Sequence, residues 1–184
     1  MHLLGLSGSL RAGSYNSALL EVAGELLPSG SRLERYSGLA AVPPYCEDDD
    51  VDPVHGAVAA LRRHVVAADG LVIATPEYNG SVPGVLKNAL DWLSRPFPDN
   101  ALRDKPVVVM GASTGIFGGI WAQEELRKVL RISGARVLDD QLAVSHSAEA
   151  FDERMRLTRE ETLEALEVAM ASLASSAQPY LLRR

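Results

Sequence analysis

Apolar runs alternate with segments of helical periodicity along almost the whole chain. Three short runs are apolar nearly throughout, and two weaker strand signals lie at Leu33–Tyr36 and Val137–Leu138; the apolar runs are Leu3–Leu6, Leu71–Ala74 and Val107–Met110. Apolar spacing predicts helices near residues 19–27, 58–66, 83–94, 119–132 and 151–174. Strands without a polar face, separated by helices, indicate a parallel sheet covered on both sides. Right-handed crossovers then give an open three-layer α/β domain.

The length of 184 residues suits a single domain spanning 1–184. No internal repeat or interdomain linker interrupts the alternation. Residues 37–53 are rich in proline, glycine and acidic side chains and are predicted to form a loop. The segment from about 175 to 184 begins with small Ala and Ser residues and is predicted to be a disordered tail.

Charge and composition exclude several classes of partner. Eighteen Lys and Arg residues against 24 Asp and Glu residues give a net charge of −6, and the basic residues are scattered, so we expect no nucleic-acid partner. No apolar run approaches the roughly 20 residues of a membrane span, and the first residues lack the features of a signal peptide. The single cysteine, Cys46, cannot form an internal disulfide, which favours a cytoplasmic protein.

Parallel α/β sheets bind ligands beyond the carboxyl ends of their strands. This rule selects three loops, 7–17, 75–82 and 111–119, and all three have unusual composition. The first combines hydroxyls, glycines and Arg11 just before a helix, as a phosphate site requires. It is neither a Walker A loop nor a dinucleotide fingerprint, because no Gly-Lys-Ser/Thr follows and the glycine spacing is wrong. The alternative is an ordinary helix cap in a flexible loop.

The second loop runs from Thr75 to Gly84 and is stiffened by two prolines. Its tyrosine and amide groups suit the face of a flat heterocycle. Glu77 has no second carboxylate or histidine beside it in the sequence, so a structural role is favoured over acid catalysis. Trp92, on the helix that follows, is expected to pack in the core.

No metal site is expected. The four histidines are widely spaced and none pairs with Cys46 at a usual ligand spacing. The acidic run Asp48–Asp50 lacks the glycine and terminal glutamate of an EF-hand, so a solvated loop is favoured over a cation site.

Three blocks of sequence carry a resemblance to a known family. They are Gly8-Ser9-Leu10-Arg11 with Ser14 and Asn16, Thr75–Asn79 continuing into Pro83–Trp92, and Ala112–Gly115 with Gly118, Gly119, Ala122 and Gln123. Together they resemble the NAD(P)H-dependent FMN reductases, a family that includes bacterial quinone, chromate and azo-dye reductases. The resemblance covers roughly residues 1–170, and the middle block is the most specific.

The resemblance implies a flavodoxin-like fold, with a five-stranded parallel sheet of order 2-1-3-4-5 and helices on both faces. It also implies one FMN per subunit and a homodimer or homotetramer, with the flavin near the subunit interface. By this resemblance the FMN phosphate would be held by Ser9, Arg11, Ser14, Asn16 and Ser17. The isoalloxazine ring would be lined by Pro76, Glu77, Tyr78 and Asn79, and its pyrimidine side would be approached by Ser113, Thr114, Gly115 and Gly118.

Two positions depart from the family pattern. Thr114 stands where proline is frequent, which loosens that turn, and Cys46 stands where asparagine is common. Neither departure removes an expected phosphate ligand. Trp121 follows the third loop, where it could cover the flavin, meet a partner subunit or pack inside.

The implied chemistry is ping-pong hydride transfer from NADPH or NADH to bound FMN, and from there to a quinone-type or other small electrophilic acceptor. No catalytic side chain is required, and backbone N–H groups of residues 113–119 would stabilise negative charge on the reduced flavin. Two alternatives stay open: a flavodoxin-like electron carrier without a nicotinamide reaction, and a binding module without flavin.

Overall fold

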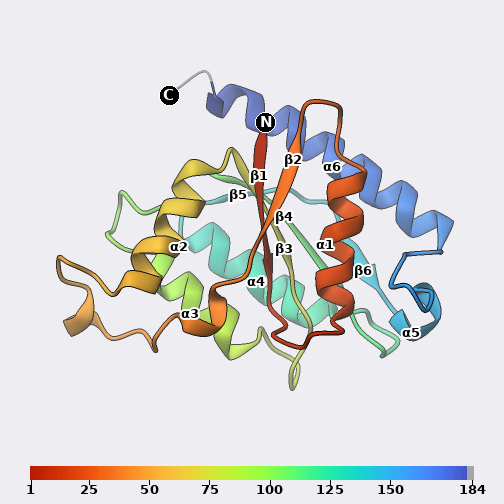
Figure 1. Cartoon of the computed structure of the whole chain (residues 1–184), viewed down its shortest axis with the longest axis horizontal. Helices are drawn as coiled ribbons and strands as arrows, with labels where there is room; N and C mark the ends of the chain where they lie inside the picture. Colours follow the sequence, from red (N-terminus) through yellow and green to blue (C-terminus); the bar gives the residue numbers. More distant parts are fainter. Residues whose placement is uncertain (182–184) are drawn as a thin grey trace.

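A computed structural model describes residues 1–181 as one parallel sheet between two layers of helices (Figure 1). The four longer strands are β1 (His2–Ser7), β2 (Arg32–Tyr36), β3 (Gly70–Ala74) and β4 (Pro106–Ala112). The sheet order is β2-β1-β3-β4-β5, and every pair is parallel. The predicted fold class and strand order are confirmed.

The fifth strand differs from the prediction, because it is divided in two. The short strands β5 (Arg136–Val137) and β6 (Leu142–Val144) both pair with β4, so the sheet has six strands. The polar residues 139–141 separate them. The buried guanidinium of Arg127 donates to the carbonyls of Leu138 and Asp140, at 2.9 and 2.6 Å, and so draws this backbone out of the strand.

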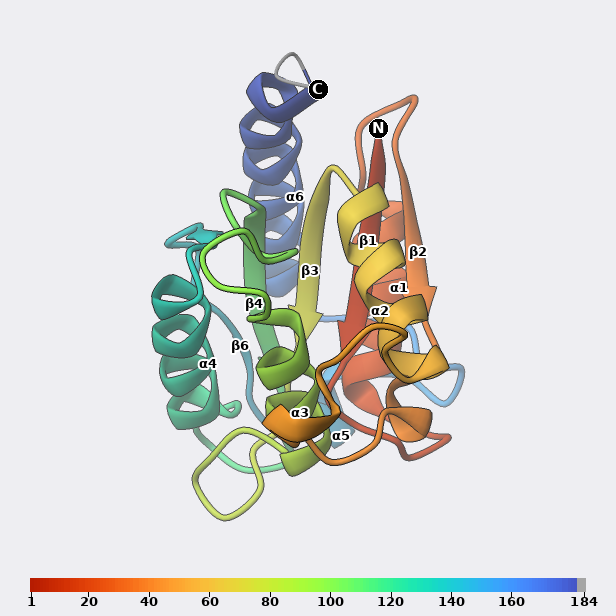
Figure 2. The ribbon, with the colours of Figure 1, turned by 90° about the vertical axis from the view of Figure 1, so that its left-hand side faces the viewer.

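Helices cover both faces of the sheet. On one face lie α1 (Tyr15–Glu25) and α6 (Glu160–Leu181), and on the other α2 (Gly56–Ala67), α3 (Gly84–Leu93) and α4 (Ile120–Ile132). Figure 2 shows α2 and α3 in front of the strands and α1 behind them. Alternate residues of β3 serve the two cores: Leu71 and Ile73 pack toward α2 and α3, whereas Val72 and Ala74 pack toward α1 and α6. Burial on both sides explains why this strand has no polar position.

The C-terminal helix is shorter at its start and longer at its end than predicted. A four-residue helix, α5 (Ser147–Ala150), is followed by a turn in which Phe151 and Leu157 form an antiparallel bridge. Met155, with φ of 59°, breaks helical geometry there. The helix continues to Leu181, beyond its predicted end near 174, so 175–181 are helical rather than a disordered tail. The last predicted tail residues, 182–184, lie outside the described residues.

The predicted loop 37–53 contains two short 3₁₀ turns, η1 (Leu39–Ala41) and η2 (Glu47–Asp49). The last residue of its acidic run, Asp50, pairs with Arg62 at 2.9 Å. Trp92 is fully buried and donates from Nε1 to the carbonyl of Pro43 at 2.8 Å, so its packing role is confirmed.

Within residues 1–181, His, Cys, Asp and Glu side chains form no group that could hold a metal ion. Among the helices described, none is sufficiently long and apolar for a membrane crossing.

Candidate functional site

The loops after β1, β3 and β4 meet at the carboxyl edge of the sheet, the lower edge in Figure 1. They enclose a pocket of about 300 Å³, lined by Ser9, Arg11, Ser14, Tyr15, Asn16, Pro76, Glu77, Tyr78, Ala112, Ser113 and Thr114. This volume lies at the lower end of the range for small-molecule sites, roughly 300–1,000 Å³. Nine of the thirteen sequence-predicted residues line this pocket, and Ser17, Asn79, Gly115 and Gly118 do not.

The first loop presents an arginine beside a helix N-terminus. Ser14 is the N-cap of α1, and its hydroxyl accepts from the backbone N–H of Ser17. No preceding helical carbonyl is available to the first N–H groups of α1, which leaves partial positive charge at the pocket. The guanidinium of Arg11 lies 5.7 Å from the centre of the Tyr15 ring and has no ion pair or side-chain hydrogen bond within residues 1–181. This arrangement is suited to a dianionic phosphate.

Two of the five residues predicted to hold the phosphate, Asn16 and Ser17, already donate side-chain hydrogen bonds within the protein, whereas the hydroxyls of Ser9 and Ser14 only accept from backbone N–H groups. Asn16 exchanges two hydrogen bonds with the backbone of Ala112, both at 2.9 Å, and is almost completely buried. Ser17 donates to the hydroxyl of Ser7 at 3.1 Å, and Ser7 in turn bonds the backbone of Ser9. Asn16 and Ser17 therefore hold α1 and the first loop against the ends of β1 and β4, while Ser9, Arg11 and Ser14 present polar groups to the pocket.

Glu77 has a positioning role in the second loop. Its Oε2 accepts from the backbone N–H groups of Trp121 and Ala122, at 3.1 and 3.2 Å, and so caps α4. This is the structural role favoured by the sequence. Beside it, Tyr78 is about half exposed and lines the pocket, whereas Asn79 lies at the turn beyond it.

The third loop turns sharply over β6. Gly118 has φ of 60°, and a Cβ there would lie 2.8 Å from the backbone of Ala143, so this position requires glycine. The backbone N–H of Ser113 donates to Val144, and that of Gly115 donates to the Ser113 hydroxyl. Between them, Thr114 lines the pocket, and its backbone N–H has no acceptor in the described part of the chain. It is therefore one backbone donor in this turn that a ligand can use.

Sequence reasoning missed two lining residues, Tyr15 and Ala112. Tyr15 packs its ring on Phe151, with centroids 5.3 Å apart, and lies beneath Arg11. A signal was present, since Tyr15 stands between two predicted ligands at the start of a helix. Ala112 opens the third block of the resemblance, but it has no polar side chain to mark it as a site residue, and it enters the wall through its place at the end of β4. Trp121, left open by the sequence, is half exposed and packs edge-on against Phe117, with ring centroids 4.8 Å apart.

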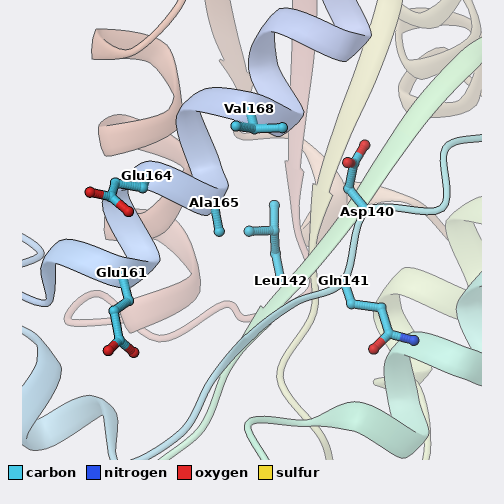
Figure 3. Close-up of a pocket in the computed structure, with 7 residues that line it drawn as sticks. All are labelled: Asp140, Gln141, Leu142, Glu161, Glu164, Ala165 and Val168. Carbon is cyan, nitrogen blue, oxygen red and sulfur yellow. The ribbon is translucent and has the colours of Figure 1, made fainter.

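The pocket fits an anionic, partly aromatic group such as FMN. It combines the free arginine, hydroxyls and helix N-terminus with a tyrosine ring and a proline, and its one carboxylate, Glu77, is already bonded to α4. A second hollow, between α6 and the segment entering β6, has a similar volume of about 360 Å³. There Glu161 and Glu164 project from α6 on one side and Asp140 from the other (Figure 3). Its negative charge is unsuited to a phosphate, in contrast to the pocket at the carboxyl edge, which has Arg11 on its wall.

Comparisons with known proteins agree with this geometry. Residues 1–149 match the sequence profile described as NADPH-dependent FMN reductase. An NAD(P)H-dependent FMN reductase of Pseudomonas aeruginosa is 41% identical over 172 residues, which are 93% of this chain and 92% of the relative. A quinone reductase of Escherichia coli K12 is 41% identical over 142 residues, 76% of this chain and 74% of the relative. Among solved structures, the flavoenzyme NAD(P)H:acceptor oxidoreductase FerB of Paracoccus denitrificans superposes with a TM-score of 0.86 at 28% identity, covering 97% of both chains.

Proposed function

This chain belongs to the NADPH-dependent FMN reductase family, and on that premise we propose that FMN binds in the pocket at the carboxyl edge of the sheet. The chain is an oxidoreductase that depends on NAD(P)H and FMN. The observation that carries the site assignment is the position of Arg11: its guanidinium pairs with no carboxylate among the described residues and lies at the N-terminus of α1, on the wall of this pocket. Thirteen residues were expected to hold FMN, and we assign eight of them to one of two roles, ligand or support.

We assign as ligands the groups whose hydrogen-bond donors are not used within the protein, together with the exposed ring of Tyr78. Arg11, Ser9, Ser14 and the first N–H groups of α1 would hold the phosphate, and Tyr78 would flank the ring. The N–H of Thr114 would donate to the pyrimidine side, where oriented backbone donors stabilise developing negative charge. The supports are Asn16, Ser17 and Glu77, whose bonds to backbone or to other loops fix the ligand-bearing segments.

Bound FMN supplies a ring that takes a hydride from a nicotinamide and delivers the electrons to an acceptor. Side chains of this chain need only hold the phosphate, orient the ring and leave one face open to both substrates in turn. Sharing one open face requires the oxidised nicotinamide to leave before the acceptor binds, so we propose a ping-pong sequence. The similarity to a quinone reductase favours a quinone-type acceptor, with other small electrophiles as a wider class.

We propose a homodimer or homotetramer with the flavin near the interface between subunits. Several large apolar side chains near the pocket loops are about half exposed or more: Leu10, Tyr78, Ile116, Phe117 and Trp121. A concentration of exposed apolar residues beside a binding site is typical of a surface that a partner covers. Light scattering coupled to size-exclusion chromatography tests this, and a monomer at micromolar concentration contradicts it.

The nicotinamide reductant and the single cysteine are consistent with a cytoplasmic enzyme.

The function is tested by reconstituting the purified protein with FMN and recording its visible spectrum. Binding gives a yellow protein with a flavin absorption band at about 450 nm. In the absence of oxygen, NADPH or NADH should reduce the flavin and bleach that band. Parallel lines in double-reciprocal plots against a quinone would support the ping-pong order. A bound flavin that neither nicotinamide reduces would identify an electron carrier instead, and a protein that binds no flavin would leave only the binding-module alternative.

A further inference from the structure

The second loop ends in a tight hairpin turn whose position decides where Tyr78 lies. Tyr78 and Ser81 exchange two backbone hydrogen bonds, at 3.1 and 3.2 Å. Between them Asn79 and Gly80 both have positive φ, 53° and 76°, as a two-residue turn of the I′ type requires. The turn is rigid within itself, but its residues 78–80 are exposed and have little packing. Its placement against the pocket therefore depends on contacts at its base.

Glu125, which does not line the pocket, supplies such a contact. Its Oε2 accepts from the hydroxyl of Ser81 at 2.6 Å and from the backbone N–H of Val82 at 3.3 Å. These two bonds, the hydroxyl first, hold the pKa of Glu125 below its ordinary value of 4.5, with Lys128 and Lys87 adding smaller effects in the same direction. The carboxylate is therefore ionised at neutral pH, and its hydrogen bonds are charge-assisted.

The contact is one of a reciprocal pair between the loop and α4. Glu77 extends from the loop to cap the first turn of α4, and Glu125 extends from the next turn of α4 to the base of the hairpin. Two carboxylates thus bridge the same two elements in opposite directions. Each fixes a different part of the loop: Glu77 its entry beside Pro76, and Glu125 its return at Ser81 and Val82.

We propose that Glu125 is a positioning residue for the flavin ring, acting through Ser81 to hold Tyr78 at the pocket wall. The proposal rests on the proposed FMN site. It distinguishes two kinds of contribution to cofactor binding, since Arg11 would act on the phosphate and Glu125 on the ring. Riboflavin, which lacks the phosphate, separates the two.

The first experiment measures amide hydrogen exchange in the protein without FMN. Glu125→Ala should raise the exchange rate of the amides of residues 78–82 by about tenfold, because two hydrogen bonds at the base of the turn are lost. Glu124→Ala is the matched control: it removes an exposed carboxylate from the adjacent position of the same helix and should leave these amides unchanged. Unchanged exchange in Glu125→Ala would show that the contact does not hold the turn, which overturns the proposal.

The second experiment measures the dissociation constants of FMN and riboflavin by quenching of flavin fluorescence. Glu125→Ala should weaken both ligands by about five- to tenfold, as expected for the loss of one charge-assisted contact. Glu125→Gln keeps an acceptor oxygen and should restore part of the affinity. Adding Ser81→Ala to Glu125→Ala should cost little more, because both substitutions break the same bond.

The outcomes separate this proposal from the proposed function. If the wild-type protein binds FMN and Glu125→Ala binds both flavins as tightly as Glu124→Ala, the FMN site stands and the role of Glu125 is rejected. A lowered melting temperature with unchanged flavin affinity would also reject it, since that is the result of a purely structural contact. If the wild-type protein binds neither flavin, the FMN site and the role of Glu125 fall together.

Discussion

At the scale of single residues, Arg11 gives the most direct test of the phosphate assignment. Arg11→Ala should weaken FMN by about 10–100-fold, the cost of a lost charge-assisted hydrogen bond, and should leave riboflavin binding nearly unchanged. Fluorescence titration measures both constants. Arg63→Ala, which removes an exposed arginine from α2 on the far face of the sheet, is the control. Equal losses for FMN and riboflavin in Arg11→Ala would mean that this residue does not contact the phosphate.

Asn16 carries a second prediction, on stability. Its side chain satisfies both backbone groups of Ala112 in a buried position. Asn16→Ala should lower the free energy of unfolding by roughly 1–3 kcal/mol, because a buried donor and a buried acceptor lose their partners. Urea unfolding of the protein without FMN measures this. If Asn16→Ala is as stable as the wild-type protein, the two hydrogen bonds to Ala112 do not contribute to stability.

Asn16 also shows how far the sequence could define the site. Spacing, hydroxyl content and resemblance located the three loops, because loop position follows from strand order and local composition. They could not assign each polar side chain to ligand or support, since the partner of Asn16 is 96 residues away along the chain. Ser17 was subject to the same limit, because the sequence specifies donors and acceptors and only the fold decides which are already paired. The structural role of Glu77 was predictable, because no second carboxylate or histidine lies beside it in the sequence, but its partners on α4 were not.

At the scale of elements, the strands buried on both faces were predictable because they are apolar throughout. The segments that differ from the prediction are those held by contacts between residues distant in the sequence. The break between β5 and β6 follows from Arg127, whose guanidinium donates to three backbone carbonyls. One of them belongs to Asp140, thirteen residues later in the chain. The helix expected from 151 starts only at 160 because Phe151 turns inward against Tyr15. Neither contact leaves a periodic signal in the local sequence.

The contacts of Arg127 give a prediction at this scale. Its guanidinium donates to Val109 as well as to Leu138 and Asp140, at 2.6 to 3.0 Å. Arg127→Leu leaves these carbonyls without their donor and should lower the free energy of unfolding by roughly 2–4 kcal/mol. The amide hydrogen-exchange rate should rise most at residues 138–144. Arg131→Leu, one turn later, removes an exposed pair with Asp139 and should cost less than about 1 kcal/mol. Equal costs in urea unfolding would contradict the role assigned to Arg127.

At the scale of the whole molecule, FMN should stabilise the fold, because its pocket is built from the ends of three central strands. A ligand that binds only the folded state at 100 times its dissociation constant adds about 2.7 kcal/mol, which is a rise in melting temperature of roughly 5–10 °C for a chain of this length. At a fixed FMN concentration the rise should be smaller for Arg11→Ala and unchanged for Arg63→Ala. Because β1, β3 and β4 form the centre of the sheet, the rise should occur in one cooperative transition. A rise confined to a minor early transition would place FMN on a peripheral segment, and no rise at saturating FMN would contradict binding at this edge.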